Sequence, residues 1–392
     1  MALGTALIES STVSAQEGEQ VSRVTAVQVG MGTVGGETIE QIIANRDRWW
    51  ADHGLDVRIG AVIGLGGALV TREPDGLADE LLHGLVHARR AGQALREAAA
   101  GRELVEAPEA IAMLINEGPV IVLDAAAGDE TAPLDARALA SGAGVVLSNK
   151  APLALPLNNP LAAELWATAG PRGHLRYEAT CGAGLPVIST LRALLDTGDE
   201  PAEIVGALSG TLGAIFTDLG NGASFSQAVR SAKANGFTEP DPRDDLSGLD
   251  VARKALILAR TIGRRVNLDD VAVENLVPEA LQAISLPEFL DRVDELDAEW
   301  ARRADAARAA GATLKYVATV PAEGPIAVGV REVSTSSLLG ALQGPENIVV
   351  IRTARYSANP LTIVGPGAGA AVTAAGMTGD LLALGALLTR RG

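Results

Sequence analysis

The stretch VTAVQVGMGTVGGETIE (residues 24–40) decides the fold of this 392-residue chain. Val24 to Val29 is a short, β-branched, apolar run of the kind that forms a buried parallel strand. It leads directly into a glycine-rich turn, and a helix-compatible segment from Glu37 to Trp50 follows. Strand, G-x-G-x-x-G and helix, in that order, are the context in which this glycine pattern binds a dinucleotide. The stretch therefore predicts an α/β chain that opens with a Rossmann-type nucleotide-binding domain.

Each glycine of this turn has a physical role in such a domain. Gly30 allows the tight turn, Gly32 lets the backbone approach the diphosphate, and Gly35 lets the helix and the strand pack closely. The diphosphate is then expected at the helix N-terminus, beside Thr33 and Val34. Unpaired N–H groups and the helix dipole favour an anion at that position.

The next predicted strand, Leu55 to Ile63, bears on the choice of cofactor. It runs into a Gly-Leu-Gly-Gly turn at residues 64–67, where an acidic residue would bind the ribose 2′-hydroxyl of NAD. Because nothing there repels a 2′-phosphate, the sequence favours NADP, with NAD as the alternative. Arg72 is a candidate partner for that phosphate, and an ordinary solvated loop arginine is the other interpretation.

Two more buried strands are predicted at residues 120–123 and 145–147. The first ends in Ala125 and Ala126 and the second in Lys150, and the ends of such strands line a cofactor crevice. Lys150 could there contact the carboxamide side of the cofactor or a substrate oxygen. An ordinary strand-end lysine is the alternative. The proline- and asparagine-rich run at residues 151–160 suggests a domain boundary.

A second unusual stretch is GFTEPDPRDDLSGLDVARK (residues 236–254). Pro240 and Pro242 predict a loop, and a helix can begin near Asp245. On that helix Asp250 and Lys254 are four residues apart, so they share a face. The pair could be a surface ion pair that contributes about 0.3–0.5 kcal/mol. Alternatively, Lys254 could donate a proton to a developing alkoxide while the surrounding acids bind a substrate ammonium group.

The turn YEATCGAGLP (residues 177–186) is a candidate cation site. Backbone carbonyls exposed by a glycine-rich turn, with the Glu178 carboxylate, suit a hard cation such as Na⁺ or K⁺. A plain turn before a helix is the alternative. Cys181 is disfavoured as a nucleophile because no histidine lies near it in sequence to activate it.

Together these motifs resemble homoserine dehydrogenase. Residues 236–250 match the pattern G-[YF]-x-E-P-D-P-x-x-D-L-x-G-x-D, and the resemblance covers five motifs between about residues 24 and 390. It implies a Rossmann-type domain plus an α+β catalytic and dimerisation domain with a mixed sheet. It also implies reversible NAD(P)-dependent interconversion of L-homoserine and L-aspartate 4-semialdehyde, on the route to threonine, methionine and isoleucine.

The resemblance implies four groups of site residues. The implied catalytic residues are Lys254, Lys150 and Asp250. The implied homoserine contacts are Gly210, Thr211, Glu239, Asp245 and Asp250, the first two in an S-G-T loop at residues 209–213. The implied cofactor contacts are Gly30, Gly32, Thr33, Val34, Gly35, Ala125, Ala126, Lys150 and Gly365. The implied ligands of Na⁺ or K⁺ are the side chain of Glu178 and the carbonyls of Cys181, Ala183 and Leu185. Phe237 departs from the family, where tyrosine is frequent.

The composition of the chain limits the kinds of partner that it can bind. The net charge of −16, from 32 Lys and Arg against 48 Asp and Glu, argues against a nucleic-acid or anionic-membrane surface. A single cysteine excludes an intrachain disulfide framework and fits a reducing cytoplasm. No apolar run is expected to reach the roughly 18 residues of a membrane helix. The partner expected is a small-molecule substrate, and the resemblance adds a homodimer or homotetramer.

Four segments are expected along the chain. They are a flexible lead-in without signal-peptide features (1–22), a dinucleotide-binding domain (23–155), a catalytic and dimerisation domain (156–355), and a strand-turn-helix that returns to the cofactor domain (356–392). The chain is expected to end too early for a C-terminal ACT domain. Two alternatives stay open: a semialdehyde dehydrogenase that uses Cys181 as nucleophile, and a non-catalytic NADP-binding protein.

Overall fold

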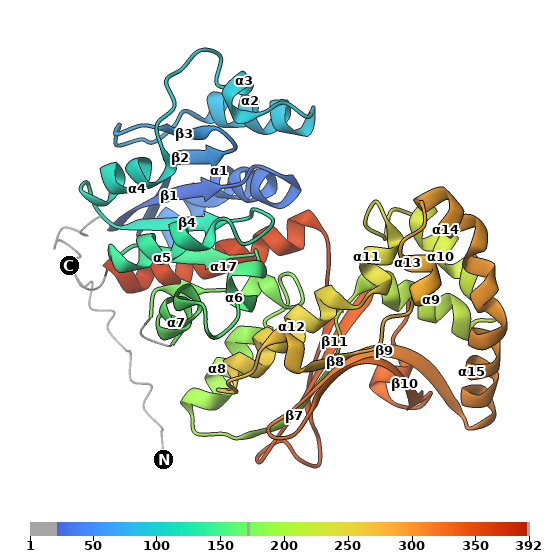
Figure 1. Cartoon of the computed structure of the whole chain (residues 1–392). Helices are drawn as coiled ribbons and strands as arrows, with labels where there is room; N and C mark the ends of the chain where they lie inside the picture. The colour runs from blue at the N-terminus through green and yellow to red at the C-terminus, as the bar shows by residue number, and fades with distance from the viewer. Residues whose placement is uncertain (1–21, 171–172, 390–392) are drawn as a thin grey trace, which may run out of the picture.

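The computed structural model describes residues 22–170 and 173–389. Within these ranges the chain forms two six-stranded sheets, at the upper left and lower right of Figure 1. Their strand orders are β3-β2-β1-β4-β5-β6 and β12-β11-β7-β9-β10-β8. The predicted fold class, a Rossmann-type α/β domain plus an α+β domain with a mixed sheet, is confirmed. The predicted lead-in at residues 1–22 lies outside the described residues, apart from Ser22.

The first sheet is parallel except for β3, which pairs antiparallel with β2. Its strands are β1 (Ser22–Val29), β2 (Leu55–Gly64), β3 (Gly67–Val70), β4 (Val120–Asp124), β5 (Gly144–Leu147) and β6 (Leu175–Arg176). The helical segments of this part are α1 (Thr33–His53), α2 (Asp79–Arg90), α3 (Leu95–Ala98), α4 (Ala107–Ile115), α5 (Ala132–Ala140), α6 (Ala151–Ala154), α7 (Pro160–Ala167), η1 (Glu178–Thr180) and α8 (Val187–Asp196). Because β6 joins this sheet, the sheet extends past the predicted domain boundary at residue 155.

Strand β1 lies in the middle of the first sheet. Val24, Ala26 and Val27 are completely buried, as expected for a strand that is covered on both faces. It pairs in parallel with β2 on one side and with β4 on the other. The strand order therefore reverses beside β1, and this reversal leaves a crevice at the carboxyl ends of β1 and β4, where open α/β sheets bind ligands.

The second sheet is antiparallel except for the β8 and β10 pair, so it is mixed. Its strands are β7 (Pro201–Ala207), β8 (Val271–Val273), β9 (Ala312–Pro321), β10 (Ile326–Ser334), β11 (Glu346–Thr353) and β12 (Leu361–Pro366). The helical segments here are α9 (Gly210–Gly220), α10 (Phe225–Ala234), α11 (Pro242–Leu246), α12 (Leu249–Thr261), η2 (Leu268–Asp270), α13 (Glu279–Gln282), α14 (Leu286–Arg292), η3 (Val293–Leu296), α15 (Asp297–Ala309) and α16 (Leu338–Ala341).

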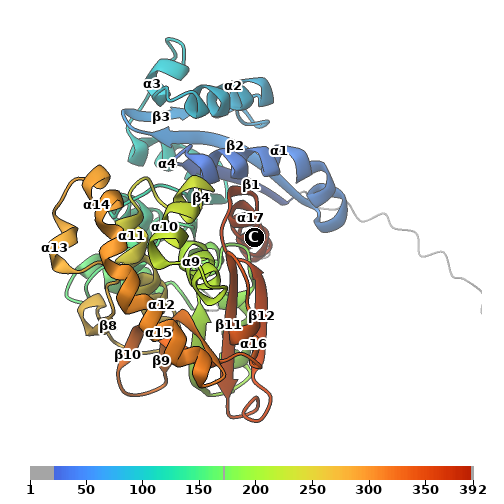
Figure 2. The ribbon, with the colours of Figure 1, turned by 90° about the vertical axis from the view of Figure 1, so that its right-hand side faces the viewer.

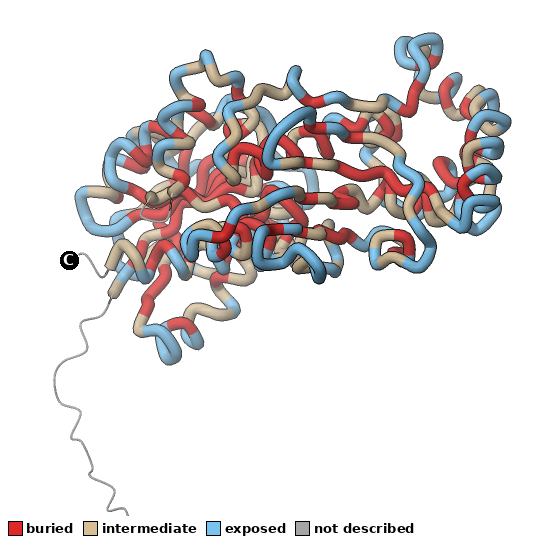
Figure 3. The backbone as a smooth tube through the Cα atoms, turned by 90° about the horizontal axis from the view of Figure 1, so that it is seen from below, coloured by how far each residue is buried: buried red, intermediate tan, exposed pale blue. Residues whose placement is uncertain are grey.

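Helices α9, α10, α12 and α15 gather on one side of the second sheet, as Figure 2 shows. Three buried aromatic side chains join three of these helices. Phe225 stacks on Trp300 with ring centroids 4.9 Å apart, and Phe216 meets Trp300 edge-on at 5.5 Å. Aromatic pairs in this geometry contribute about 0.5–1.5 kcal/mol beyond the area that they bury. In Figure 3 the buried residues follow the interior strands, and the exposed residues lie on the outer loops and helix faces.

The C-terminal helix α17 (Ala370–Thr389) packs on the first domain, against α1, β4 and β5. It is the long red helix beneath the first sheet in Figure 1. By length and composition it could cross a membrane, contrary to the prediction that no segment would reach that length. Met377, Leu381 and Leu384 are nevertheless completely buried against the first domain. One face of α17 is therefore part of the core of the first domain.

Helices α2 and α3 are separate, because Gly92 between them has a φ of 88°. One local prediction was wrong. The loop predicted at residues 209–213 is the first turn of α9, since the Ser209 side chain accepts a hydrogen bond from the Leu212 amide and caps the helix. The turn at residues 64–67 joins β2 to the unpredicted strand β3.

The close packing at Gly35 yields a stability prediction. A Cβ atom at Gly35 would lie 2.0 Å from the Gly30 carbonyl oxygen. We expect Gly35→Ala to lower the free energy of unfolding by about 3 kcal/mol, the upper end of the usual overpacking cost. Denaturant unfolding measures this change. Gly32→Ala is the matched control, because a Cβ there meets nothing within 4 Å. Equal stability of the two variants would contradict the assigned packing.

Candidate active site

A cavity of about 980 Å³ lies at the crevice between β1 and β4. It is lined at one end by the glycine turn and at the other by the turn after β4, with Gly30, Gly32, Ala125 and Ala126 all in its wall. A Cβ at Gly30, whose φ is 77°, would lie 3.0 Å from the Ala126 amide nitrogen. The two turns therefore touch beneath the cavity, and only glycine allows this approach.

The cavity fits a dinucleotide. At Gly32 a Cβ would meet nothing within 4 Å, so the backbone there is open to a ligand. Gly32 is also the N-cap of α1, and Thr33 and Val34 begin that helix, so their amides lie at its N-terminus. Gly35 lies behind the turn against the Gly30 carbonyl and does not line the cavity.

Two arginines that the sequence did not single out line the same cavity. Arg89 lies in the last turn of α2 and Arg137 is on α5. Arg72, the phosphate partner considered from the sequence, is not in the cavity wall. Spacing along the chain could not reveal Arg89, since it reaches the cavity only through the tertiary packing of α2.

The buried carboxylate of Asp124 links the turn after β4, which borders the cofactor cavity, to the segment after β5 that contains Lys150. Asp124, at the end of β4, accepts hydrogen bonds from the Ala126 amide (2.8 Å), the Thr131 hydroxyl (2.7 Å) and the Asn149 side-chain amide (3.1 Å). Burial raises the pKa of Asp124, and these hydrogen bonds oppose that rise. The sequence showed this aspartate only as a strand-end residue, because its three partners come from separate segments.

Three charged side chains form the centre of the site. Asp250 places one carboxylate oxygen 3.3 Å from Lys150 Nζ and the other 2.8 Å from Lys254 Nζ. Lys254 is buried, with a side chain 11% exposed, and it also donates to the Leu208 carbonyl oxygen at 2.6 Å. Burial would raise the pKa of Asp250, but the two ammonium groups outweigh it and hold this pKa well below its usual range. Asp250 and Lys254 do form the i,i+4 ion pair, but Lys254 is buried and Lys150 shares the carboxylate, so this is more than an isolated surface pair.

A second group of predicted residues meets beside this centre. The Thr211 hydroxyl lies 2.8 Å from one oxygen of Asp245, and the Glu239 amide donates to the other oxygen at 2.8 Å. Burial raises the pKa of Asp245, and the negative charges of Glu239 and Asp250 add to that rise. The Glu239 side chain itself is exposed.

Gly210 and Gly365 lie apart from the cofactor cavity. Gly210 begins α9 and packs against Pro345, where a Cβ would lie 3.2 Å from the carbonyl oxygen. Gly365 is on β12, and a Cβ there would lie 2.9 Å from the Leu185 side chain. The structure thus places Gly365 against the candidate cation turn, outside the cavity wall.

In the candidate cation turn the Glu178 carboxylate is already hydrogen-bonded, so the backbone carbonyls are the more available ligands for a cation. Both oxygens of Glu178 already accept hydrogen bonds, from the amides of Ile188 (2.7 Å) and Ser189 (2.8 Å) in the first turn of α8. Ala183 has a φ of 56°, and its carbonyl oxygen points at Gly376, where a Cβ would lie 2.9 Å away. The side chain of Glu178 therefore stabilises a helix N-terminus, and its role as a cation ligand stays a prediction.

Cys181 does not have the surroundings of a nucleophile. It is completely buried, and its thiol lies 3.7 Å from the Lys254 carbonyl oxygen. Burial raises its pKa to about 12, so the thiol stays protonated at neutral pH. The structure does not favour the alternative in which Cys181 forms a thioester.

Several known proteins are similar to this chain in sequence. A family model described as homoserine dehydrogenase matches residues 186–382. The homoserine dehydrogenase of Paracoccidioides brasiliensis is 39% identical over 289 residues, which are 70% of this chain and 77% of that protein. The chloroplastic bifunctional aspartokinase/homoserine dehydrogenase 1 of Arabidopsis thaliana is 48% identical over 213 residues, 54% of this chain and 23% of its own length. The chain thus spans about a quarter of the length of such bifunctional relatives.

Solved structures with a similar fold cover most of the chain. A protein of unknown function from Candida auris has a TM-score of 0.77 and 30% identity, over 93% of this chain and 98% of its own. The putative homoserine dehydrogenase of Archaeoglobus fulgidus has a TM-score of 0.69 and 25% identity, over 92% and 98%. A hyperthermophilic archaeal homoserine dehydrogenase mutant, solved in complex with NADPH, has a TM-score of 0.67 and 25% identity, over 92% and 97%.

Proposed function

This chain belongs to the homoserine dehydrogenase family, and we propose that it catalyses the reversible, NAD(P)-dependent interconversion of L-homoserine and L-aspartate 4-semialdehyde. The observation that carries the proposal is the buried Lys254, paired with Asp250, whose other carboxylate oxygen lies 3.3 Å from Lys150 Nζ. Such a group matches a reaction in which an alkoxide oxygen must gain or lose a proton.

Lys254 is the proton carrier in this proposal. Its ammonium group has three N–H donors, of which one is bonded to the Leu208 carbonyl and one faces Asp250. The third is free to donate to the aldehyde oxygen as that oxygen becomes a hydroxyl. Asp250 fixes the direction of the ammonium group, and Lys150 holds the other oxygen of Asp250 in place.

The acids beside Lys254 bind the substrate. L-homoserine carries an ammonium group, and the carboxylates of Glu239 and Asp245 are the negative groups next to the catalytic lysine on this side. Thr211 and the Glu239 amide fix the orientation of Asp245. Gly210 lets the start of α9 pack against Pro345, which sets the position of Thr211.

The cofactor lies in the cavity at the carboxyl ends of β1 and β4. Nicotinamide supplies or accepts the hydride when the dinucleotide is bound. Gly30, Gly32, Thr33 and Val34 bind the diphosphate, and Ala125 and Ala126 bound the cavity on the other side. NADP is the preferred cofactor in this proposal, as suggested by the NADPH complex of the archaeal relative.

Arg89 is the proposed partner of the 2′-phosphate. It lines the cavity together with Gly64 and Leu65 at the end of β2, where the adenosine ribose binds in this type of domain. In the described part of the chain Arg89 forms no ion pair, so its guanidinium group is available to a phosphate.

We further propose that the turn at residues 178–185 binds Na⁺ or K⁺. The carbonyls of Cys181, Ala183 and Leu185 supply oxygen ligands, and Glu178 balances the charge while it bonds to α8. The turn also contacts the helix of Lys254, since the Cys181 thiol lies against the Lys254 carbonyl. A cation there stabilises the position of the catalytic helix.

The family also suggests a homodimer or homotetramer, and the cysteine content suggests a cytoplasmic enzyme. Val205 and Val350 on the second sheet and Leu339 on α16 are only partly buried and pack against one small apolar cluster, which makes this face a candidate contact between subunits. Light scattering measures the assembly directly.

The proton-carrier role predicts a large loss of turnover in Lys254→Met. We expect kcat for homoserine oxidation to fall about 10³-fold, within the usual range for removal of a general acid or base. The fold should persist, because Lys150 still neutralises Asp250. Arg253→Met, a neighbouring cation on the same helix, is the matched control and should keep its activity. If Cys181→Ala abolished turnover while Lys254→Met remained active, the thioester alternative would be correct.

The cofactor assignment predicts a selective effect of Arg89→Met. We expect KM for NADP to rise by about tenfold or more, as for the loss of one charge-assisted hydrogen bond, with little change in KM for NAD. Arg72→Met is the control, since Arg72 lies outside the cavity wall. An equal rise for both cofactors, or no rise, would remove Arg89 from the phosphate site.

The cation proposal predicts a dependence of activity on small monovalent ions. Replacing Na⁺ and K⁺ by tetramethylammonium at equal ionic strength should lower kcat/KM for homoserine several-fold. Readdition of either ion should restore it. Identical rates in all three salts would argue against a cation at residues 178–185 and leave the role of Lys254 untouched.

A further inference from the structure

Lys315 is a buried cation that the proposed reaction does not use. It lies on β9 with 3% of its surface exposed. Its ammonium group donates to the Leu342 carbonyl oxygen at 2.5 Å. Burial lowers its pKa from the usual value for lysine, and no neighbouring charge opposes that effect. Within the described residues Lys315 forms no ion pair, although the whole chain carries a net charge of −16.

A buried ammonium group with one neutral acceptor is costly. Lysine has three N–H donors, and a buried charge is normally paired or fully hydrogen-bonded. The Leu342 carbonyl satisfies one donor, where it ends the short helix α16. The other donors require a partner, which a bound anion would supply.

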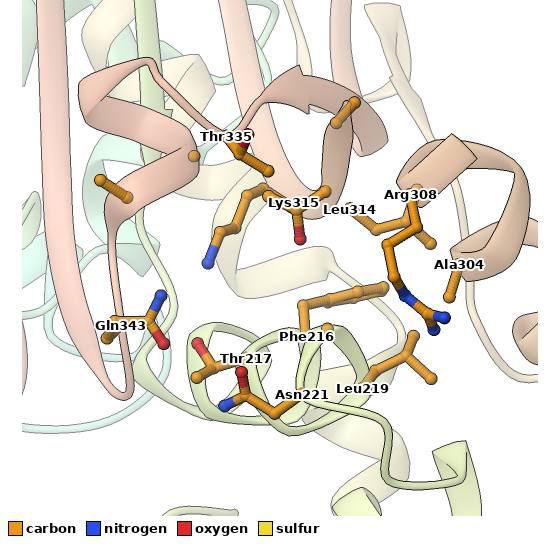
Figure 4. Close-up of a pocket in the computed structure, with 15 residues that line it drawn as sticks. Phe216, Thr217, Leu219, Asn221, Ala304, Arg308, Leu314, Lys315, Thr335 and Gln343 are labelled. Atoms are coloured by element: carbon orange, nitrogen blue, oxygen red, sulfur yellow. The ribbon is translucent and has the colours of Figure 1, made fainter. Parts of the chain in front are cut away.

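The space for such an anion is present. A cavity of about 250 Å³ lies at the C-terminal end of α9, between α15, the start of β9 and α16, and Lys315 is part of its wall. Figure 4 shows the Lys315 ammonium group pointing into this cavity toward Gln343 and Thr217. The Thr217 hydroxyl accepts a hydrogen bond from the Gly344 amide at 3.0 Å, so its own proton is free to be donated.

The opposite side of the cavity is apolar. Phe216, Leu219 and Leu314 form this wall, and all three are buried. Arg308 lies at the rim, where it pairs with Asp305 at 3.0 Å. The cavity therefore combines a cation and neutral hydrogen-bonding groups at one end with a hydrocarbon surface at the other.

We propose that this cavity binds a small organic carboxylate with a short apolar substituent. The carboxylate accepts hydrogen bonds from Lys315, Thr217 and the Gln343 amide, and the substituent packs on Phe216 and Leu219. A single buried positive charge matches a monoanion. The volume excludes a drug-sized molecule, since sites for those are usually about 300–1,000 Å³.

This site is distinct from the active site. Thr211, at the start of α9, contacts Asp245 in the active site, whereas Thr217 to Asn221 at the other end line the cavity. A helix of 11 residues separates its two ends by about 15 Å at 1.5 Å per residue. A ligand in the cavity would thus contact the same helix as the substrate, from its opposite end.

The test uses the full chain without homoserine or nucleotide, so its outcome does not depend on the proposed reaction. Isothermal titration calorimetry with 3-methylbutanoate should give saturable binding. We expect Lys315→Met to weaken this binding about tenfold or more, as for loss of a charge-assisted hydrogen bond. The variant should fold, because methionine fills the space of the lysine stem and removes a buried charge. Arg331→Met, a cation on the neighbouring strand outside the cavity, should bind as the parent does.

Two further ligands check the chemical class. The neutral analogue 3-methylbutanamide should bind at least tenfold more weakly, because it lacks the charge. Sulfate should also bind more weakly, since it cannot use the apolar wall. Absence of saturable 3-methylbutanoate binding, or equal binding by Lys315→Met, would overturn the proposal. Sulfate binding as tight as that of the carboxylate would overturn the assigned ligand class.

Discussion

The Asp250 carboxylate, held between two lysines, is the interaction on which the active site depends. Lys150 follows β5 of the first sheet, and Lys254 belongs to α12, which packs on the second sheet. One carboxylate therefore joins the cofactor domain to the catalytic domain at the point where the reaction is proposed to occur. Because Lys254 is buried, it needs both Asp250 and the Leu208 carbonyl to satisfy its charge. This requirement fixes the position of α12, the helix that carries Lys254, relative to the turn after β4 that borders the cofactor cavity.

The rest of the fold supports this contact from both sides. On the cofactor side, Asp124 accepts hydrogen bonds from the Ala126 amide, in the turn after β4, and from the side chain of Asn149. Asn149 precedes Lys150, and it therefore cannot move independently of that turn. On the substrate side, Thr211 and the Glu239 amide hold Asp245. The C-terminal helix closes the first domain, and the candidate cation turn lies between that helix and α12. Charged groups in this site are thus positioned by neutral hydrogen bonds from well-packed elements, the arrangement that preorganised catalysis requires.

Much of this could be predicted from the sequence, for physical reasons that differ from residue to residue. The glycine turn between Val29 and Thr33 has a local signature, because the positive φ of Gly30 and its close approach to Ala126 require glycine. The Asp250 and Lys254 pair was visible as a helical spacing, although spacing alone left open whether it was a surface pair. Burial and the approach of Lys150 decided that question, and both depend on how distant segments pack. The same limit explains why Arg89 was missed and why the sequence did not show that Glu178 accepts hydrogen bonds from α8 amides.

The proposed exchange of a proton between Lys254 and the substrate oxygen can be tested most directly by a crystal structure of the protein with L-homoserine and NADP. We expect the homoserine hydroxyl oxygen to lie about 2.6–3.2 Å from Lys254 Nζ, the reach of a hydrogen bond. We also expect the substrate ammonium group to lie beside Glu239 and Asp245. A substrate whose hydroxyl lies against Cys181, or out of hydrogen-bond reach of Lys254, would contradict the role proposed for Lys254.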